Sequence, residues 1–261
     1  MKYPPIAMTW RTQKIREEYL KMPVPQEDNP YLDKKYKHFC TGDRWITLGF
    51  LEGWLAHEDA PTTRRRRSYA EAAELYAAQP IITEHELLTG HLYLPEYTPE
   101  EQKRYDQLCE MFRMSSVTLL ERGPRIDHLS LDLEKLLRIG ISGIVAEIHA
   151  RMAELNLQDR NVYPEFEVMK QYDFYECCLL ELEALKDLQK RYAQKAREMA
   201  ETAPEPRKSE LSQMAEILEW VPEHPARNFR EALQSVQFFL GTLFGLYPLN
   251  RPDRYLYPYY A

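Results

Sequence analysis

The sequence predicts a mainly α-helical fold, and three observations support this prediction. Glycine is scarce, with 9 residues among 261, whereas the helix-favouring residues Leu, Ala, Glu and Lys are abundant. The 18 prolines leave long windows without proline, at 62–79, 100–123, 125–163, 165–203, 207–221 and 226–247. Within several windows, apolar residues recur every three or four positions, the spacing of one helix face. We therefore expect helices to fill most of these windows.

Prolines and helix-start signals predict where the first elements lie. Five prolines within the first 30 residues leave room for one short helix, at 9–21. Two short strands are expected, at 80–83 and 91–94. Three segments have the residue spacing of a capping box, which marks the start of a helix: 68–71, 83–86 and 98–101.

The most regular helical pattern lies within 168–201. Its apolar stripe steps by three or four positions through Cys178, Leu182, Leu185, Leu188, Tyr192, Ala196 and Met199. The segments 133–155 and 229–243 carry similar stripes. In the former, Gly140 and Gly143 interrupt the period, which predicts a kink or the close approach of another backbone segment.

Composition and charge exclude several classes of protein. The net charge of -7 argues against a nucleic-acid-binding protein, which usually presents a basic face. Four arginines at 64–67 could grip a phosphate, but a charged helix start is favoured because acidic residues lie nearby in the sequence: Glu52, Glu58, Asp59, Glu71 and Glu74. No apolar run approaches the roughly 18 residues of a membrane-spanning helix, and the N-terminus lacks the apolar segment of a signal peptide. We expect a cytoplasmic protein that binds neither nucleic acid nor membrane.

The cysteines do not form a recognisable redox motif. None of the four is spaced as Cys-x-x-Cys, which fits a reduced cytoplasmic setting. The adjacent Cys177 and Cys178 invite a catalytic interpretation, but nearby Asp173, Glu176 and Glu181 would raise the pKa of a thiol. Cys178 also falls on the apolar stripe, so we expect core packing.

Neither metal-binding nor nucleotide-binding spacings are present. The combinations closest to a ligand cluster are His85 and Glu86 with His91, and His38 with Cys40. Neither matches a known zinc spacing, so we expect no metal site. The chain also lacks a Gly-x-Gly-x-x-Gly segment, a P-loop and a Gly-x-Ser-x-Gly segment.

Two polar loops are candidates for a binding site. His128 lies in a turn that leads into the helix expected near Leu133, where an imidazole could exchange a proton in a cavity or make a turn hydrogen bond. Arg251 and Asp253 lie between a helix and a tyrosine-rich end, where such pairs order a loop or orient an anionic substrate. The residues alone leave both interpretations open.

Four stretches, in order along the chain, resemble segments of glycyl radical enzymes of the pyruvate formate-lyase type. These are 80–90 (PIITEHELLTG), 128–144 (HLSLDLEKLLRIGISGI), 221–234 (VPEHPARNFREALQ) and 250–260 (NRPDRYLYPYY). The resemblance covers the chain from about Ser68 and corresponds to the first third of a family member. It implies two regions: an irregular and short-helix region at 1–67, and a truncated N-terminal portion of a pyruvate formate-lyase-like domain at 68–261.

The resemblance implies a fold and a type of chemistry. Family members build a barrel of strands wrapped in helices and are commonly homodimers. A radical-SAM activating enzyme installs a glycyl radical in a C-terminal loop, the radical passes to a cysteine, and the thiyl takes hydrogen from a small organic substrate. The reactions include C–C, C–N and C–S lysis and dehydration, in anaerobic cells. This chain is expected to bind no cofactor directly.

The sequence also departs from the family pattern. The thiyl cysteine and the glycyl loop follow the tyrosine-rich stretch in family members, so neither is present in these 261 residues. Cys177 and Cys178 precede that stretch and are not expected to be the thiyl site. The resemblance therefore implies a chain that is not catalytic alone and that needs the C-terminal remainder of the enzyme, in cis or in trans. The aromatic end is likewise expected to be covered by further chain or a partner.

The resemblance also suggests substrate-binding roles. His128 falls where the dehydratase branch has a histidine that touches a substrate hydroxyl, and Arg251 and Asp253 match the family's arginine and aspartate. Pro248 stands where diol dehydratases have serine, which argues against a diol substrate. Arg125 could instead pair with a carboxylate or sulfonate.

Two alternatives keep the resemblance but change the role. In one, this chain is a subunit of a split enzyme and binds a separately encoded C-terminal chain. In the other, it is a non-catalytic helical protein that binds or regulates the activating enzyme or a full-length enzyme.

Overall fold

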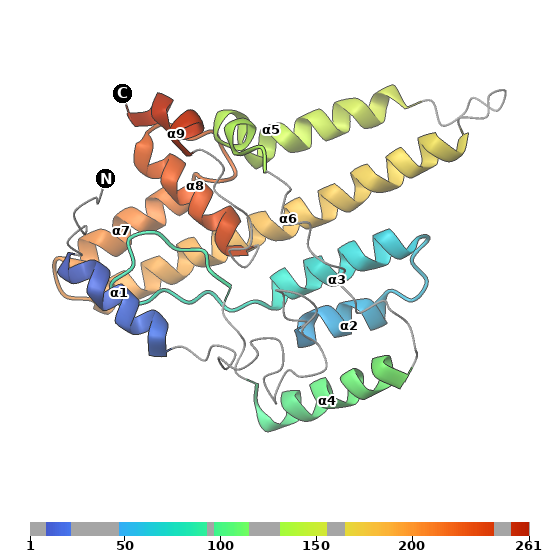
Figure 1. Ribbon diagram of the computed structural model, residues 1–261, viewed down its shortest axis with the longest axis horizontal. Helices are drawn as coiled ribbons and strands as arrows, with labels where there is room; N and C mark the ends of the chain where they lie inside the picture. Colours follow the sequence, from blue (N-terminus) through green and yellow to red (C-terminus); the bar gives the residue numbers. More distant parts are fainter. Residues whose placement is uncertain are drawn as a thin grey trace, which may run out of the picture.

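The structure, a computed structural model, describes residues 9–21, 47–92, 97–114, 131–155, 165–242 and 252–260. Within these ranges the chain is entirely helices and loops (Figure 1). The helices are α1 (Trp10–Lys21), α2 (Leu48–Ala56), α3 (Thr63–Ala77), α4 (Pro99–Met114), α5 (Leu133–Glu154), α6 (Glu165–Thr202), α7 (Arg207–Leu218), α8 (Phe229–Thr242) and α9 (Pro252–Tyr260). The mainly α-helical prediction is therefore confirmed for the described ranges, while the barrel remains a prediction.

The proline-free windows each contain one helix, α3 to α8, and the short N-terminal helix is α1, as predicted. Helix α2 was not predicted because eight of its nine residues are apolar or glycine, so no alternation of apolar and polar residues marks it. Its buried residues lie on one side: Phe50, Leu51, Gly53 and Trp54. Helix α9 was not predicted either, because Pro258 lies inside it.

The strand predicted at 80–83 is wrong. This segment is loop, and the described residues contain no strand with which it could pair. Carbonyl oxygens within it and just before it accept hydrogen bonds from arginine side chains. Arg207 Nη2 donates to the Thr83 carbonyl at 2.9 Å, and Arg191 Nη1 donates to the Ala78 carbonyl. In the other predicted strand, His91 and Leu92 are also loop, and 93–94 lies outside the described residues.

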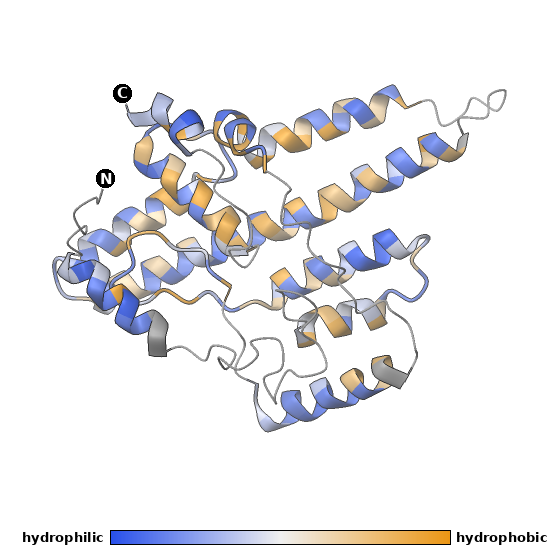
Figure 2. Cartoon of the chain, in the orientation of Figure 1, coloured by the Kyte–Doolittle hydropathy of each residue, from blue (hydrophilic) through white to orange (hydrophobic). Residues whose placement is uncertain are grey.

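Helix α6 organises the molecule. It has 38 residues, which makes it about 57 Å long at 1.5 Å per residue. Helices α3 and α7 pack along it, and α2 and α4 follow beyond α3. Helix α5 runs beside α6 on the opposite side from α3, with α8 and α9 near its start (Figure 1). The apolar faces of these helices turn towards one another (Figure 2).

In the N-terminal half of α6, the residues that are buried differ from those of the predicted apolar stripe. Leu188, Tyr192 and Ala196 are fully buried, as predicted. Cys177 and Ala184 are buried there, however, whereas the predicted Cys178, Leu182 and Leu185 are only partly buried. The difference arises because α6 packs against helices on more than one side, so no single narrow stripe is buried.

The three capping-box predictions have different outcomes. Thr98 and Glu101 form the reciprocal box at the start of α4, with distances of 2.8 Å and 3.3 Å. Glu86 Oε2 accepts from the Thr83 N–H at 2.9 Å, but no helix follows. Ser68 lies inside α3, whose N-cap is Thr62, and donates instead to Glu181 Oε1 at 2.6 Å.

The arginines at 64–67 form the charged helix start that was predicted. Arg66 pairs with Glu58 and Arg67 with Glu71, both among the expected acids. Arg65 instead reaches α6, where its Nε donates to Asp173 Oδ1 at 3.0 Å. Arg65, Arg66 and Arg67 therefore face acidic partners. Arg64 lies over the Phe174 ring of α6, with its Cζ 5.9 Å from the ring centroid.

The predicted division between two regions, at residue 67, lies inside α3, which begins at Thr63 and packs on α2. The division itself stays a prediction. No helix in the described ranges is both long enough and apolar enough to span a bilayer.

Candidate substrate-binding region

Only one of the four predicted substrate-binding residues lies within the described ranges. Asp253 is exposed in the first turn of α9. His128, Arg125 and Arg251 lie outside the described residues. The candidate region is therefore built from the helices that flank them: α5, which follows His128 in the sequence, and α9, which follows Arg251.

Helix α9 packs against the first turns of α5. Tyr255 is buried in a cluster with Leu133 and Leu136 of α5. Burial raises the pKa of Tyr259, and its neighbours on α5 act on that pKa in opposite directions, Arg138 lowering it and Glu134 raising it. The contact between α9 and the first turns of α5 therefore positions the start of α9, which includes Asp253, relative to the start of α5.

The start of α5 is itself well defined. Asp132 is the N-cap, and its Oδ1 accepts from the Lys135 N–H at 2.9 Å. Leu131, one residue earlier, packs against the cluster that contains Tyr255. The point at which the chain enters α5 therefore lies against α9.

Helix α5 is kinked at Gly140, as predicted, and the segment 221–226 enters the kink. The Ile141 N–H donates to the Pro222 carbonyl at 3.0 Å, and the Ser142 N–H donates to the Glu223 carbonyl at 2.9 Å. On the other side of the kink, the Ala226 N–H donates to the Leu137 carbonyl at 3.0 Å. Backbone groups that the kink frees are thus satisfied by the inserted segment.

Gly140 is required at this position for two reasons. Its φ of 65° is in the left-handed region, which residues with a side chain adopt at a cost. A Cβ atom there would also lie 2.5 Å from the Glu223 carbonyl oxygen, closer than van der Waals contact permits.

A second backbone junction joins the loop before α4 to α8. The buried Gln234 side chain accepts from the Thr89 N–H at 3.1 Å and donates to the Thr89 carbonyl at 2.7 Å. Gly90 follows with a φ of 122° and packs directly on Phe238 of α8. Together with the kink and α9, this junction brings together described parts of all four stretches that carry the family resemblance.

The N-terminal turn of α8 carries a buried carboxylate. Glu231 is 3% exposed, and both of its oxygens accept from Arg227, with Nη2 at 2.7 Å. Burial raises the pKa of Glu231, but the hydrogen bonds from Arg227 and Asn228 outweigh this effect and hold the pKa below its usual value. This carboxylate is therefore ionised and orders the segment that enters the α5 kink.

The adjacent cysteines have raised pKa values, and Cys177 is buried whereas Cys178 is only partly buried. Cys177 is buried, and burial is the main cause of its raised pKa. Burial, with Glu181 and Cys177 beside it, raises the pKa of Cys178 to about 11. Both residues lie on α6, so neither belongs to the region around α5 and α9.

Of the metal-ligand combinations considered from the sequence, His85 and Glu86 with His91 is the one within the described residues, and it is not assembled. His91 Nε2 lies 2.7 Å from Gln237 Nε2, and Glu86 binds the Thr83 N–H. His38 and Cys40 lie outside the described residues. One group of metal-ligand residues does occur in the described ranges, comprising Glu18, Glu84 and His85.

A groove lies between α3, α5 and α6. It has a volume of about 550 Å³, with Tyr76, Val145 and His149 in its walls. Of the predicted substrate-binding residues, Asp253 is the one that the structure describes, and it does not line the groove.

Comparison of this chain with models of known protein families shows the family to which it belongs. The model of the pyruvate formate lyase-like family matches residues 78–261. The chain belongs to this family. The matched relatives and structural neighbours of this family member are glycyl radical enzymes, as the resemblance implied.

Two curated relatives that match this chain differ in activity. The isethionate sulfite-lyase of Oleidesulfovibrio alaskensis is 38% identical over 136 residues, covering 49% of this chain and 16% of the relative. The (2S)-3-sulfopropanediol dehydratase of Klebsiella oxytoca is 33% identical over 141 residues, covering 51% of this chain and 16% of the relative. This pyruvate formate lyase-like chain thus aligns with about one-sixth of the length of these relatives.

A solved structure extends the likeness to the whole chain. A structure concerned with 1,2-propanediol dehydration in Roseburia inulinivorans matches with a TM-score of 0.75 at 22% identity. The match covers 100% of this chain and 37% of that one. The helices of this family member therefore share the fold of one part of a larger protein.

The sequence identified the four stretches that carry the family resemblance, but it did not predict the contacts between them. The Gln234–Thr89 junction joins residues that are 145 positions apart. A polar Gln on the apolar face of a predicted helix was the available signal, because a buried amide requires hydrogen-bonding partners.

Proposed function

We propose that this chain forms the N-terminal part of the substrate cavity of a glycyl radical lyase or dehydratase. The match of residues 78–261 to the pyruvate formate lyase-like family is the observation that carries the proposal. The thiyl cysteine and the glycyl loop belong to the C-terminal remainder of the enzyme, supplied in cis or in trans. A radical-SAM activating enzyme installs the glycyl radical there, and that radical supplies the hydrogen-abstraction chemistry.

The packing of α9 on α5 supports a shared site for the four predicted residues. His128 stands four positions before Asp132, the N-cap of α5, and Arg251 is bonded directly to Pro252, the first residue of α9. Because n residues of extended chain span at most about 3.6 Å each, both residues remain within reach of the α5–α9 contact. Asp253 is exposed at that contact.

The substrate that we propose is a small anionic molecule with a hydroxyl or carbonyl group. Arg125 and Arg251 supply guanidinium forks, which match the geometry of a sulfonate or carboxylate. The names of both curated relatives support a sulfonate, since isethionate and sulfopropanediol are sulfonates. Pro248 at the position of a diol-dehydratase serine also favours a substrate other than a simple diol.

The residues of this chain act by binding and positioning. Arg125 and Arg251 hold the anionic end, which fixes the carbon that loses hydrogen. His128 donates a hydrogen bond to the leaving hydroxyl or the carbonyl, and this bond strengthens as negative charge develops in the transition state. Asp253 orients an arginine or a substrate hydroxyl.

Exposed apolar side chains support the presence of further protein on this chain. Among the described residues, seven large apolar side chains are at least about half exposed: Trp10, Tyr76, Phe166, Met169, Phe174, Tyr257 and Tyr260. Such surface is typical of an interface. We propose that it packs against the remainder of the enzyme, that the assembled enzyme is a homodimer, and that it works in the cytoplasm of anaerobic cells.

A non-catalytic helical binding protein is the second candidate. The described helices bury three apolar clusters of their own, which supports folding without a partner. This candidate predicts a stable chain that binds the activating enzyme or a full-length enzyme without ever supporting turnover.

The test uses this chain joined to, or mixed with, its C-terminal remainder, together with an activating enzyme under anoxia. Electron paramagnetic resonance measures the glycyl radical, and product formation is measured with isethionate, other hydroxysulfonates, hydroxycarboxylates and 1,2-propanediol. We expect turnover of an anionic substrate.

We also expect Arg125→Glu to raise KM by about 10-fold or more, since tenfold corresponds to 1.4 kcal/mol of lost binding. Arg16→Glu, on exposed α1, is the matched control. A radical without turnover of any anionic substrate, or an unchanged KM in Arg125→Glu, would contradict the proposal.

A further inference from the structure

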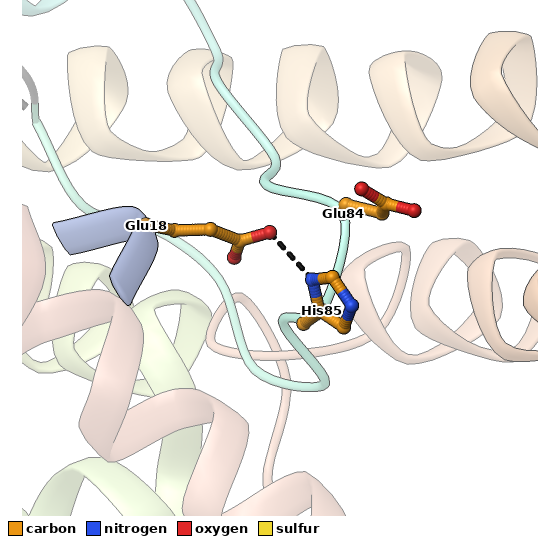
Figure 3. A group of neighbouring side chains, drawn as sticks. All are labelled: Glu18, Glu84 and His85. Carbon is orange, nitrogen blue, oxygen red and sulfur yellow. Dashed lines mark hydrogen bonds and ion pairs between the residues drawn. The ribbon is translucent and has the colours of Figure 1, made fainter. Parts of the chain in front are cut away.

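We propose that Glu18, Glu84 and His85 form a binding site for a divalent transition-metal ion that fastens α1 to the loop 83–86. One ligand atom from each residue lies within 4.8 Å of the others. Figure 3 shows the three side chains, one from α1 and two from the loop. The proposal concerns binding and stability only, so it stands or falls independently of the proposed function.

The chemistry of the three side chains selects the class of ion. An imidazole nitrogen with two carboxylate oxygens suits Zn²⁺ and related first-row divalent ions, which accept mixed nitrogen and oxygen ligands. Three protein ligands leave a coordination position for water. The calcium and magnesium ions prefer oxygen ligands alone, so the histidine argues against them.

One carboxylate in the group is incompletely satisfied. Glu18 Oε1 lies 2.5 Å from His85 Nδ1, and the two side chains are 21% and 19% exposed. The other oxygen, Glu18 Oε2, is buried and has no hydrogen-bond partner among the described residues. A buried carboxylate oxygen without a partner is costly, and a bound cation would compensate for it.

The third ligand is available for coordination. In the part of the chain that the structure describes, Glu84 makes no hydrogen bond or ion pair, and its side chain is exposed. Binding an ion therefore breaks no existing contact of Glu84. A simple Glu18–His85 ion pair would not require Glu84, and this difference separates the two interpretations.

Both sides of the site are held in position by other contacts. Arg207 donates to the carbonyl oxygens of Thr83 and Glu86 at 2.9 Å and 2.7 Å, which fixes the loop. Arg11 of α1 donates to Glu210 Oε1 at 2.5 Å, and Arg207 also binds Glu210. Both nearby guanidinium groups, of Arg11 and Arg207, therefore donate to Glu210 and not to Glu18 or Glu84. Such support is what orients ligands for a metal ion.

The test is a metal titration of the 261-residue chain after removal of any affinity tag and treatment with a chelator. Zn²⁺ is titrated in competition with a chromophoric chelator, and Co²⁺ is titrated by visible absorption. We expect saturation at one equivalent. Loss of a ligand is expected to weaken binding by about 10-fold or more in both Glu84→Gln and His85→Gln. Glu201→Gln, an exposed residue at the end of α6, is the control and should bind as the parent does.

Two further observations keep the test decisive. Circular dichroism of each variant shows whether the helices are intact, and Glu84→Gln is the key variant because it removes no contact seen in the described residues. Hydrogen exchange of α1 should slow when Zn²⁺ is added and recover with chelator. Absence of saturable binding, or binding that Glu84→Gln leaves unchanged, would overturn the proposal. The latter result would point to another set of ligands, such as the cysteines.

Discussion

Gln234 of α8 holds the backbone of Thr89 through both atoms of its amide, accepting at 3.1 Å and donating at 2.7 Å. Gln234 is 1% exposed and Thr89 is fully buried. The two residues belong to different stretches of the family resemblance, so this contact fastens one stretch to another. A buried polar group that loses its partner retains its desolvation cost.

We predict that Gln234→Ala destabilises the chain by about 2 kcal/mol or more, because it leaves the Thr89 N–H and carbonyl unpaired in the core. Equilibrium unfolding in urea measures the change. Gln213→Ala is the control, since Gln213 is exposed and should cost less than about 0.5 kcal/mol. Equal effects of the two substitutions would show that the Gln234–Thr89 contact adds no stability.

The kink of α5 gives a second prediction. Gly140→Ala should destabilise by about 2 kcal/mol or more, because a left-handed φ is strained for alanine and its Cβ would press on the Glu223 carbonyl. Ser142→Ala is the matched control, since the Ser142 hydrogen bond to Glu223 comes from the backbone. Urea unfolding of both variants checks the prediction, and a stable Gly140→Ala protein would mean that the kink is not required.

The arginines at 64–67 give a third prediction, because they differ in burial. Arg65 and Asp173 are 15% and 13% exposed. Arg65→Ala leaves this buried carboxylate with a hydrogen bond from Thr62 but without a cationic partner, so it should cost about 3 kcal/mol. Arg67 pairs with Glu71 on the helix surface and is 45% exposed, so Arg67→Ala should cost only about 0.3–0.5 kcal/mol. The same urea experiment compares them, and similar losses would contradict the assignment of Arg65 as the anchor between α3 and α6.

The fourth prediction concerns pH. The pKa of Cys178 is raised from 9.0 to about 11, chiefly by burial, so the folded state favours the neutral thiol. The contribution of this thiol to stability is therefore complete below pH 9 and is lost as the pH rises from about 9 to 11. The unfolding free energy of the parent minus that of Cys178→Ser should be constant below that window and should fall across it. Parallel pH profiles would show that the pKa of Cys178 does not change on folding.

The sequence predicted the helices whose apolar residues recur along one face, and it predicted the kink at Gly140 from the interruption of that pattern. It did not predict α2, whose apolar residues surround the helix, or α9, which contains Pro258. The segment 80–83 was taken for a strand because Ile81 and Ile82 favour strands, but no neighbouring strand exists in the described ranges to pair with it.

Contacts between residues far apart in the chain could not be predicted from the sequence. The insertion of Pro222 and Glu223 into the α5 kink joins segments that local spacing cannot relate. The group of Glu18 with His85 spans 67 positions, so no short metal motif could mark it. For the substrate, the sequence supplied candidate residues, and of these Asp253 is the one whose surroundings the structure describes.

The most direct test of the central claim is to sequence the source DNA through and beyond the codon for Ala261. If this chain is the N-terminal part of a glycyl radical enzyme, the same frame or an adjacent gene encodes a thiyl-type cysteine loop followed by a glycyl loop. A stop codon after Ala261, with no such sequence encoded nearby, would contradict the claim and leave the non-catalytic binding protein as the account of this chain.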